Sequence, residues 1–331
     1  MISRRAVHAI LYLLLSSVYS ISKADTGIAN NSYSSFGIGI QVFTYTEDFS
    51  GAKFDVVSTS SPLSVVQYSG GYTALDETDG FYITTTSPLF NISANEAWGI
   101  SGILPTGSSS ITSYPSVQAN QTELGLSILN LSLSRIFSPG HQGLVGVRYS
   151  THNFTRYEFT PGADAEEFNN WLISQNSDVP AYADGVAFDI PGCTNNINPP
   201  VVGMECTSVA LQEQVTSLSL SIGYKYDTIF VKGYRGPRFI VATSIAIPAF
   251  YMITNTLHPG ASLIGSFGEG YDASVKTSLA VFERKDFQLN LGLETALMHR
   301  NQVIQTSTNL SYPSSDTVSF STYMSFDWSF D

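Results

Sequence analysis

The chain has 331 residues, a formal net charge of −12 and only 13% charged side chains, about half the proportion usual in soluble domains. This composition, with 18 Tyr and 20 Phe, does not suit a helical enzyme, and it suits strands that are apolar on one face and mildly polar on the other. The acidic balance argues against nucleic acids and other anionic polymers as partners, because phosphate binding needs a basic surface.

The first 24 residues have the three parts of a secretory signal peptide. Arg4 and Arg5 provide positive charge, an apolar run covers 6–18, and the triplet 22–24 (Ser-Lys-Ala) has the small-x-small form of a cleavage site. We expect cleavage before Asp25, which leaves 12 basic and 27 acidic side chains and a charge of −15. The alternative is an uncleaved anchor helix, for which the apolar run is short.

Residues 25–331 are predicted to form one domain of about ten strands, with ten to twelve as the range. Each strand is a period-two segment bounded by turn residues. The expected strands are about 36–48, 64–75, 81–90, 122–137, 144–160, 215–227, 238–254, 271–283, 287–300 and 318–331. A further strand could lie within 95–104.

The last segment shows the alternation most clearly. From Val318 to Phe330 every second residue is apolar or Thr, whereas the other parity carries Ser, Tyr and Asp. Successive side chains of a strand point to opposite faces, so this strand has one apolar and one polar face. At the end of an exported chain rich in such segments, the pattern favours the closing strand of a membrane barrel, with its apolar face toward lipid.

The connections between the strands alternate in length. Short turns join the second and third, fourth and fifth, sixth and seventh, and eighth and ninth strands. The long connections are expected at about 49–63, 91–121, 161–214, 255–270 and 301–317. Short turns at one end and long loops at the other are typical of an outer-membrane barrel, with the short turns in the periplasm.

In these features nearly the whole mature chain resembles bacterial outer-membrane β-barrel proteins as a class. The resemblance implies an all-β, transmembrane, antiparallel up-and-down barrel in the outer membrane of a Gram-negative bacterium. It also implies outer-membrane lipid and lipopolysaccharide as surroundings. Barrels of this class usually end on an aromatic residue, whereas here Asp331 follows Phe330.

If the apolar parity faces lipid, the polar parity faces the lumen. The predicted lumen-lining residues are Glu47, Arg148, His152, Arg156, Glu158, Lys225, Arg238, Asp272, Lys276, Glu294 and Asp327. A barrel of about ten strands is narrow and is largely filled by its own side chains. Paired charges that plug the lumen are therefore one interpretation. A porin-like passage for a small solute, which the basic stripe of Arg148, His152 and Arg156 would favour as an anion, is another.

Two alternatives belong to other classes. An outer-membrane hydrolase, either a protease or a lipid-modifying enzyme, would need a nucleophile or water beside a base at the extracellular rim. Ser150 and His152 share a face of one strand with Glu158, but two residues of spacing separate side chains by about 6.5–7 Å, too far for a direct hydrogen bond. We therefore expect no catalytic residues. A secreted soluble all-β protein, with the apolar parity in a core, is the other alternative.

The connection 161–214 carries two further features. The stretch 164–172 has acidic residues first and then Phe168, Trp171 and Leu172 at helical spacing, which predicts a short helix. Cys193 and Cys206 are predicted to form a disulfide in an oxidising compartment, closing a loop of about 14 residues and contributing ~3 kcal/mol. A two-cysteine metal site is the alternative. Such an ordered external segment is where an extracellular ligand would be expected.

Other chemistry has no sequence signal. The chain shows no phosphate loop, dinucleotide fingerprint or cluster of metal ligands, so no cofactor and no metal are expected. The run from Phe239 to Ile253 is short for a transmembrane helix and contains Pro248, which argues against a helical membrane protein.

Overall fold

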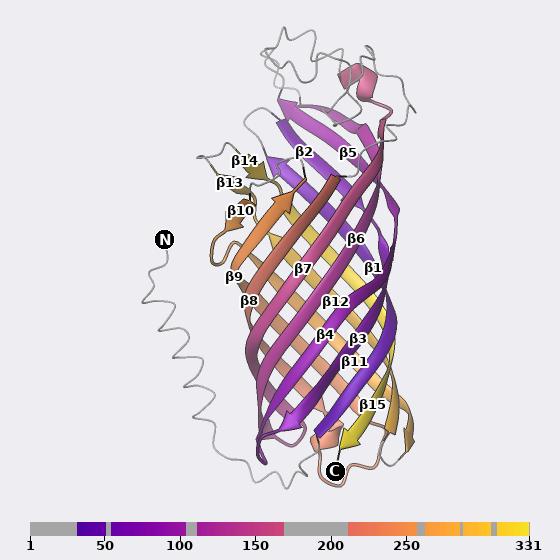
Figure 1. Ribbon diagram of the computed structural model, residues 1–331, viewed down its shortest axis with the longest axis vertical. Helices are drawn as coiled ribbons and strands as arrows, with labels where there is room; N and C mark the ends of the chain where they lie inside the picture. Colours follow the sequence, from indigo (N-terminus) through magenta and orange to yellow (C-terminus); the bar gives the residue numbers. More distant parts are fainter. Residues whose placement is uncertain are drawn as a thin grey trace.

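The computed structural model describes residues 32–50, 54–103, 111–168, 211–256, 262–284, 287–305 and 310–330. They form a tall antiparallel β-barrel whose strands are strongly tilted (Figure 1). The sheet closes on itself because the first and last strands pair along their whole length, from Ser32 opposite Phe330 to Asp48 opposite Ser314. The prediction of an all-β up-and-down barrel is confirmed.

Ten strands form the ring, and each corresponds to a predicted strand. In ring order they are β1 (Ser32–Ser50), β3 (Leu63–Ala74), β4 (Asp79–Ile92), β6 (Ile111–Ser138), β7 (His141–Pro161), β8 (Leu211–Asp227), β9 (Phe239–Asn255), β11 (Gly270–Arg284), β12 (Phe287–Arg300) and β15 (Ser314–Phe330). Several are longer than predicted at the end that carries the long connections, which we call the loop end.

Two of the predicted long connections are largely strand. β2 (Phe54–Ser60) precedes β3, and β5 (Ala94–Ile103) follows β4, so the extra strand suspected within 95–104 extends an existing one. β2 and β5 pair with each other and with β1 and β6, which carries the wall further at the loop end (Figure 1). The prediction of loops over 49–63 and 91–121 is wrong because the backbone ladder continues where the regular apolar alternation stops.

Smaller strands occupy the connections 255–270 and 301–317 as well. β10 (Ser262–Gly265) pairs with β9, and β13 (Val303–Gln305) pairs with β14 (Leu310–Tyr312). Both lie toward the loop end in Figure 1.

The opposite end, which we call the turn end, has short connections as predicted. The turn from β6 to β7 is Pro139-Gly140, and Gly140 has a φ of 80°. This left-handed conformation suits glycine, and a Cβ here would lie 2.8 Å from the Tyr226 ring. The single-turn 3₁₀ helix η1 (Thr228–Phe230) begins the connection between β8 and β9. The alternation of short and long connections is confirmed.

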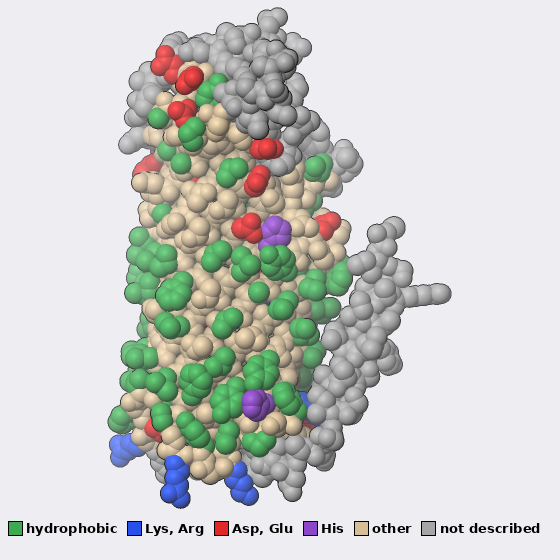
Figure 2. Space-filling model, turned by 180° about the vertical axis from the view of Figure 1, so that it is seen from behind, with side chains coloured by type: hydrophobic (Ala, Val, Ile, Leu, Met, Phe, Trp, Pro, Cys, Tyr) green, Lys and Arg blue, Asp and Glu red, His purple; other side chains and the backbone are tan. Residues whose placement is uncertain are grey.

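The apolar parity of the strands faces outward. On β1 the exposed row contains Phe36, Ile38, Ile40 and Val42, and on β15 it contains Val318, Phe320, Met324 and Trp328. Figure 2 shows hydrophobic side chains around the wall, exposed acidic groups toward the loop end and Lys and Arg at the turn end. A soluble protein would bury this parity in a core, so the soluble alternative is wrong. No helix of the described residues is long and apolar enough to cross a membrane.

A substitution at Met324 tests whether the exposed apolar face of the wall contacts lipid. Met324 lies in the middle of the exposed row on β15, opposite Ile38 on one side and Leu291 on the other. Replacing Met324 by Arg should lower the free energy of unfolding in lipid vesicles by about 2–4 kcal/mol, the cost of a cation near the bilayer midplane. Thr59→Arg, on the exposed face of β2 beyond the apolar row, is the control and should cost less than about 1 kcal/mol. Equal losses for both variants would contradict a lipid-facing belt.

Candidate functional site

The polar parity of β7 lines the lumen. Arg148, Ser150, His152 and Arg156 alternate along this strand and are all at least nine-tenths buried, as the sequence predicts. Glu158 is the exception. It has a φ of 55° and is exposed, at a point where the pairing with β6 shifts register between Ala119 and Gln121. The prediction that Glu158 lines the lumen is wrong, because this bulge reverses the parity of the strand.

An ion cluster lies in the lumen near the turn end. We call it the turn-end layer: Lys225, Asp227, Arg238 and Asp327, with Tyr33 and Tyr82. Arg238 binds both oxygens of Asp227, at 2.9 and 2.7 Å, and it also reaches the Asp327 carboxylate at 3.0 Å.

Two tyrosines complete the turn-end layer. The Lys225 ammonium lies 3.1 Å from Asp227, and it donates to the hydroxyls of Tyr33 at 2.9 Å and Tyr82 at 3.0 Å. The Arg238 guanidinium also stacks over the Tyr33 ring at 4.3 Å. Tyr33 and Tyr82 also pack in one buried cluster with Tyr72, Ile136 and Phe230.

An apolar cluster lies in the lumen toward the loop end. We call it the loop-end layer: Phe43, Tyr45, Leu124, Leu126, Phe154 and Met298, capped by Arg156. The Arg156 guanidinium lies 4.1 Å from the centre of the Phe154 ring and bonds Glu96 at 2.7 and 3.0 Å and Glu47 at 2.8 Å.

The Arg156 cap lies beyond the apolar row of β1, which ends at Val42. Burial alone would raise the pKa of Glu96, but the Arg156 guanidinium and hydrogen bonds from Asn120 and Thr122 hold that pKa below its usual range. Glu96 is therefore ionised at neutral pH, and the cap is a charge-assisted pair.

A second group of charges connects several strands of the lumen wall. Asp272 accepts from Arg300 at 2.6 Å and lies 3.8 Å from Arg148. Arg148 also donates to Asn130 at 2.8 Å and to Ser244 at 3.1 Å. These contacts join β6, β7, β9, β11 and β12 across the lumen, so the predicted residues Arg148 and Asp272 are brought together by the fold.

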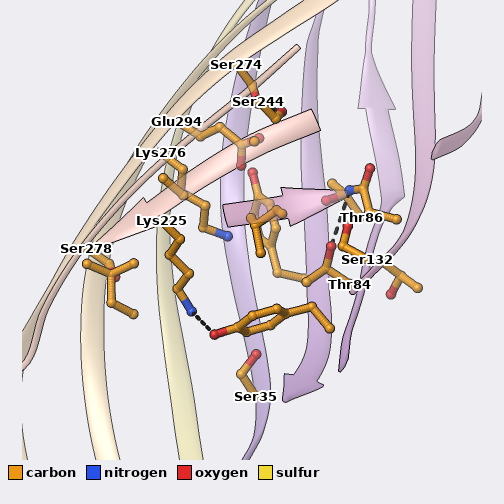
Figure 3. A pocket seen from close by; sticks show the side chains of 18 of the residues that line it. Ser35, Thr84, Thr86, Ser132, Lys225, Ser244, Ser274, Lys276, Ser278 and Glu294 are labelled. Carbon is orange, nitrogen blue, oxygen red and sulfur yellow. Dashed lines mark hydrogen bonds between the residues drawn. The ribbon is translucent and has the colours of Figure 1, made fainter. Parts of the chain in front are cut away.

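A cavity of about 220 Å³ lies between the two layers. Figure 3 shows Lys225, Lys276 and Glu294 pointing into it from one side, with Thr84, Thr86 and Ser132 on the other. Two much smaller cavities, of about 30 and 10 Å³, lie beside the loop-end layer. The central cavity has mostly hydroxyl-bearing walls.

The sequence predicted the charged lumen residues better than the neutral ones. Apart from Glu158, all the predicted residues lie in the lumen, but Tyr33, Tyr68, Tyr82, Tyr323 and Asn290 were not singled out, and neither were Glu96 and Asp227. The sequence did contain an indication of the inward tyrosines, because inward-facing glycines lie on the same face of the wall. Gly292 leaves room for Tyr323, whose ring would lie 2.0 Å from a Cβ at that position.

Several predicted features of the connection 161–214 lie outside the described residues. These are the Cys193–Cys206 disulfide and residues 169–172 of the predicted helix. The described part begins a helical turn at residues 165–168, where the Phe168 amide donates to the Asp164 carbonyl at 2.9 Å. The Phe168 ring meets Tyr114 of β6 edge-on at 5.4 Å. The signal peptide 1–24 also lies outside the described residues, and no group of metal-ligating side chains occurs within them.

Removing the cap of the loop-end layer should be costly. Arg156→Met leaves Glu47 and Glu96 buried without a cation, and breaking a buried pair in this way costs about 3–5 kcal/mol. Arg235→Met, at an exposed turn, should change stability by less than about 0.5 kcal/mol. Urea unfolding in detergent micelles measures both. A further Glu96→Gln in the Arg156→Met background should recover part of the loss, and no recovery would argue against an unpaired carboxylate as the cause.

Comparison with known proteins supports the fold. No protein-family model matches the sequence, and no curated protein matches it. Among solved structures, the outer-membrane protease OmpT of Escherichia coli is similar, with a TM-score of 0.56, 9% identity, and coverage of 91% of this chain and 97% of that one. The outer-membrane protein OprG of Pseudomonas aeruginosa and the toluene transporter TodX of Pseudomonas putida also match, with 9% and 6% identity.

Coverage is high for these two matches as well, at 92% and 95% of this chain and 98% and 93% of theirs. Their TM-scores of 0.29 and 0.27 are too low to bear on the fold, so the structural similarity is based on OmpT. At 9% identity that similarity concerns the fold and not the activity. The closed ten-stranded ring, the apolar outer wall and the polar lumen give this chain the fold of an outer-membrane β-barrel, with its turn end periplasmic and its loop end extracellular.

Proposed function

We propose that the protein is a closed outer-membrane barrel whose lumen is plugged by its own side chains, and that it acts at the cell surface as a structural or recognition barrel. The observation that carries this proposal is the pair of layers in series, the turn-end layer and the loop-end layer. Nearly all the side chains that build them are at least nine-tenths buried. A pore for small solutes would instead need a continuous water-filled path.

The energetics also favour a rigid plug. The four charged groups of the turn-end layer are fully matched, two cations against two anions, and they join β8, β9 and β15. Opening this layer would separate the paired charges from one another, and a buried charge left unpaired costs several kcal/mol. The loop-end layer would have to separate six apolar side chains from one another.

The hydrolase alternative has less support among the described residues. His299 binds Asp316 at 2.7 Å through Nδ1 and Asn301 at 2.9 Å through Nε2, so neither ring nitrogen is left for a nucleophile. Ser150 is bonded to Ser217 at 2.7 Å, and the buried Nε2 of His152 has no hydrogen-bond partner. A general base within hydrogen-bond reach of a serine, as acyl transfer requires, is not formed by these groups.

Recognition is assigned to the extracellular end. Connecting loops carry binding sites more often than barrel walls do, and the connection between β7 and β8 is the longest in the chain. Its described beginning is held on the wall by Asp164, which accepts from the Ser116 amide at 2.8 Å. An extracellular ligand at this segment, within a lipopolysaccharide-containing leaflet, is part of the proposal.

Conductance in a planar bilayer tests the plug. The native protein should give no conductance steps, and opening one layer alone should leave it silent because the other layer still blocks the path. Tyr33→Ala with Tyr82→Ala opens the turn-end layer, and Phe43→Ala with Phe154→Ala opens the loop-end layer. The protein carrying all four changes should conduct.

A matched control distinguishes opening of the lumen from a general loss of barrel stability. Phe36→Ala, Phe250→Ala, Phe287→Ala and Phe320→Ala remove four aromatic rings from the outer wall and should leave the protein silent. Heat-modifiable migration on a gel verifies that each variant is folded. Steps from the native protein, or a silent but folded four-fold lumen variant, would contradict a plug made of these two layers.

A further inference from the structure

We propose that the central cavity is a binding site for a small neutral polyhydroxy solute of about the size of a monosaccharide. This goes beyond the closed lumen: one layer has to open transiently to admit the solute, and the other layer still blocks passage through the barrel. Three features of the lumen support this site: the size of the cavity, one buried amide without partners among the described residues, and a lysine–glutamate pair that faces the cavity.

The size of the cavity fits such a solute. Its volume of about 220 Å³ is far above the ~10–15 Å³ that a single water molecule needs, so it has room for a solute of about the size of a sugar ring. The turn-end layer bounds it through Tyr33, Tyr82 and Asp327. Toward the loop end it reaches Arg148, whose guanidinium is already bonded to Asn130 and Ser244.

Asn290 points to a ligand that both donates and accepts hydrogen bonds. Its side chain is 2% exposed and lines the cavity from β12, and neither its amide nitrogen nor its amide oxygen has a partner among the described residues. Leaving a buried polar group unsatisfied costs about 1–3 kcal/mol, so the cavity has an unmet demand for one acceptor and one donor. A hydroxyl group provides both, whereas a carboxylate or an ammonium provides one of them.

Lys276 and Glu294 also offer hydrogen-bonding groups to a solute in the cavity. They are direct cross-strand partners on β11 and β12, and both line the cavity. The Lys276 ammonium lies over the Tyr323 ring at 4.5 Å and the Tyr68 ring at 5.3 Å, and no ion pair to Glu294 forms within the described part of the chain. A solute hydroxyl placed near both can accept from the ammonium and donate to the carboxylate.

The charge balance of the cavity argues for a neutral solute. The charge of Lys276 is cancelled by Glu294, and the two cations of the turn-end layer are cancelled by Asp227 and Asp327. Asp272 is shared between Arg300 at 2.6 Å and Arg148 at 3.8 Å, and Arg148 is also bonded to Asn130 and Ser244. Because these charges are already engaged by groups of the protein, an ion would lose its hydration for little electrostatic gain, whereas a neutral polyol exchanges water for the hydroxyl and amide groups of the wall.

The rest of the wall has the same character. Ser35, Ser278 and Ser325 line the cavity on the side of β1, β11 and β15, and Thr84, Thr86 and Ser132 line it on the side of β4 and β6. Figure 3 shows these hydroxyls, Ser325 excepted, around Lys276 and Glu294. A solute with hydroxyls around a ring would find donors and acceptors in several directions.

Equilibrium dialysis of the full chain in detergent, with radiolabelled glucose as the probe, tests the proposal. We expect saturable binding at one site per barrel. Asn290→Leu and Glu294→Gln should each weaken it at least tenfold, because each removes a hydrogen-bonding group that the solute uses. Asn153→Leu, the same change at an exposed position of β7, is the matched control and should bind as the native protein does.

Competition defines the class of solute. Unlabelled myo-inositol should displace the glucose, whereas alanine, a zwitterion, and inorganic phosphate should not. The proposal is overturned if the native protein retains no glucose, if alanine or phosphate displaces it better than inositol does, or if both cavity variants, folded by heat-modifiable migration, bind normally. A conducting native protein that binds glucose would contradict the plug and leave this site standing.

Discussion

The closure of β1 against β15 is the constraint on which the rest of the structure depends. Inside a bilayer no water is present to satisfy backbone N–H and C=O groups, so a sheet can cross only if it has no free edge. The seventeen-residue register between these two strands removes that edge. It also fixes the two faces of each strand, because a slip of one residue would turn the Ser and Tyr face of β15 toward lipid.

The small number of strands then makes the lumen a packed interior. Ten strands leave a width that side chains from opposite walls can span, as Lys225 of β8 does in reaching Tyr33 of β1 and Tyr82 of β4. Inward glycines adjust this filling, as Gly292 does for the Tyr323 ring. Between the matched charges near the turn end and the apolar cluster toward the loop end, the filling is incomplete, and the central cavity is what remains.

The sequence predicts the wall of this barrel well, since alternation is a local property. The strand 287–300 matches β12 at both ends, and the polar parity places Lys276, Glu294 and Asp327 in the lumen as expected. The prediction from alternation fails at Glu158, where a bulge reverses the parity of the strand. It also fails over β2 and β5, whose backbone pairs without a regular apolar row. The buried role of Glu96 was missed for the same reason, because its strand was not assigned.

By itself the sequence determined that the chain forms about ten two-faced strands, that short and long connections alternate between them, and that most of the charged residues it singled out point inward. These properties follow from side-chain periodicity and connection length, which are read along the chain. The tertiary structure alone decided which lumen groups meet: Arg156 with Glu47 and Glu96, Arg238 with Asp227 and Asp327, and Asn290 with none. Such partners lie on different strands, and their heights in the lumen depend on the tilt and stagger with which the sheet closes.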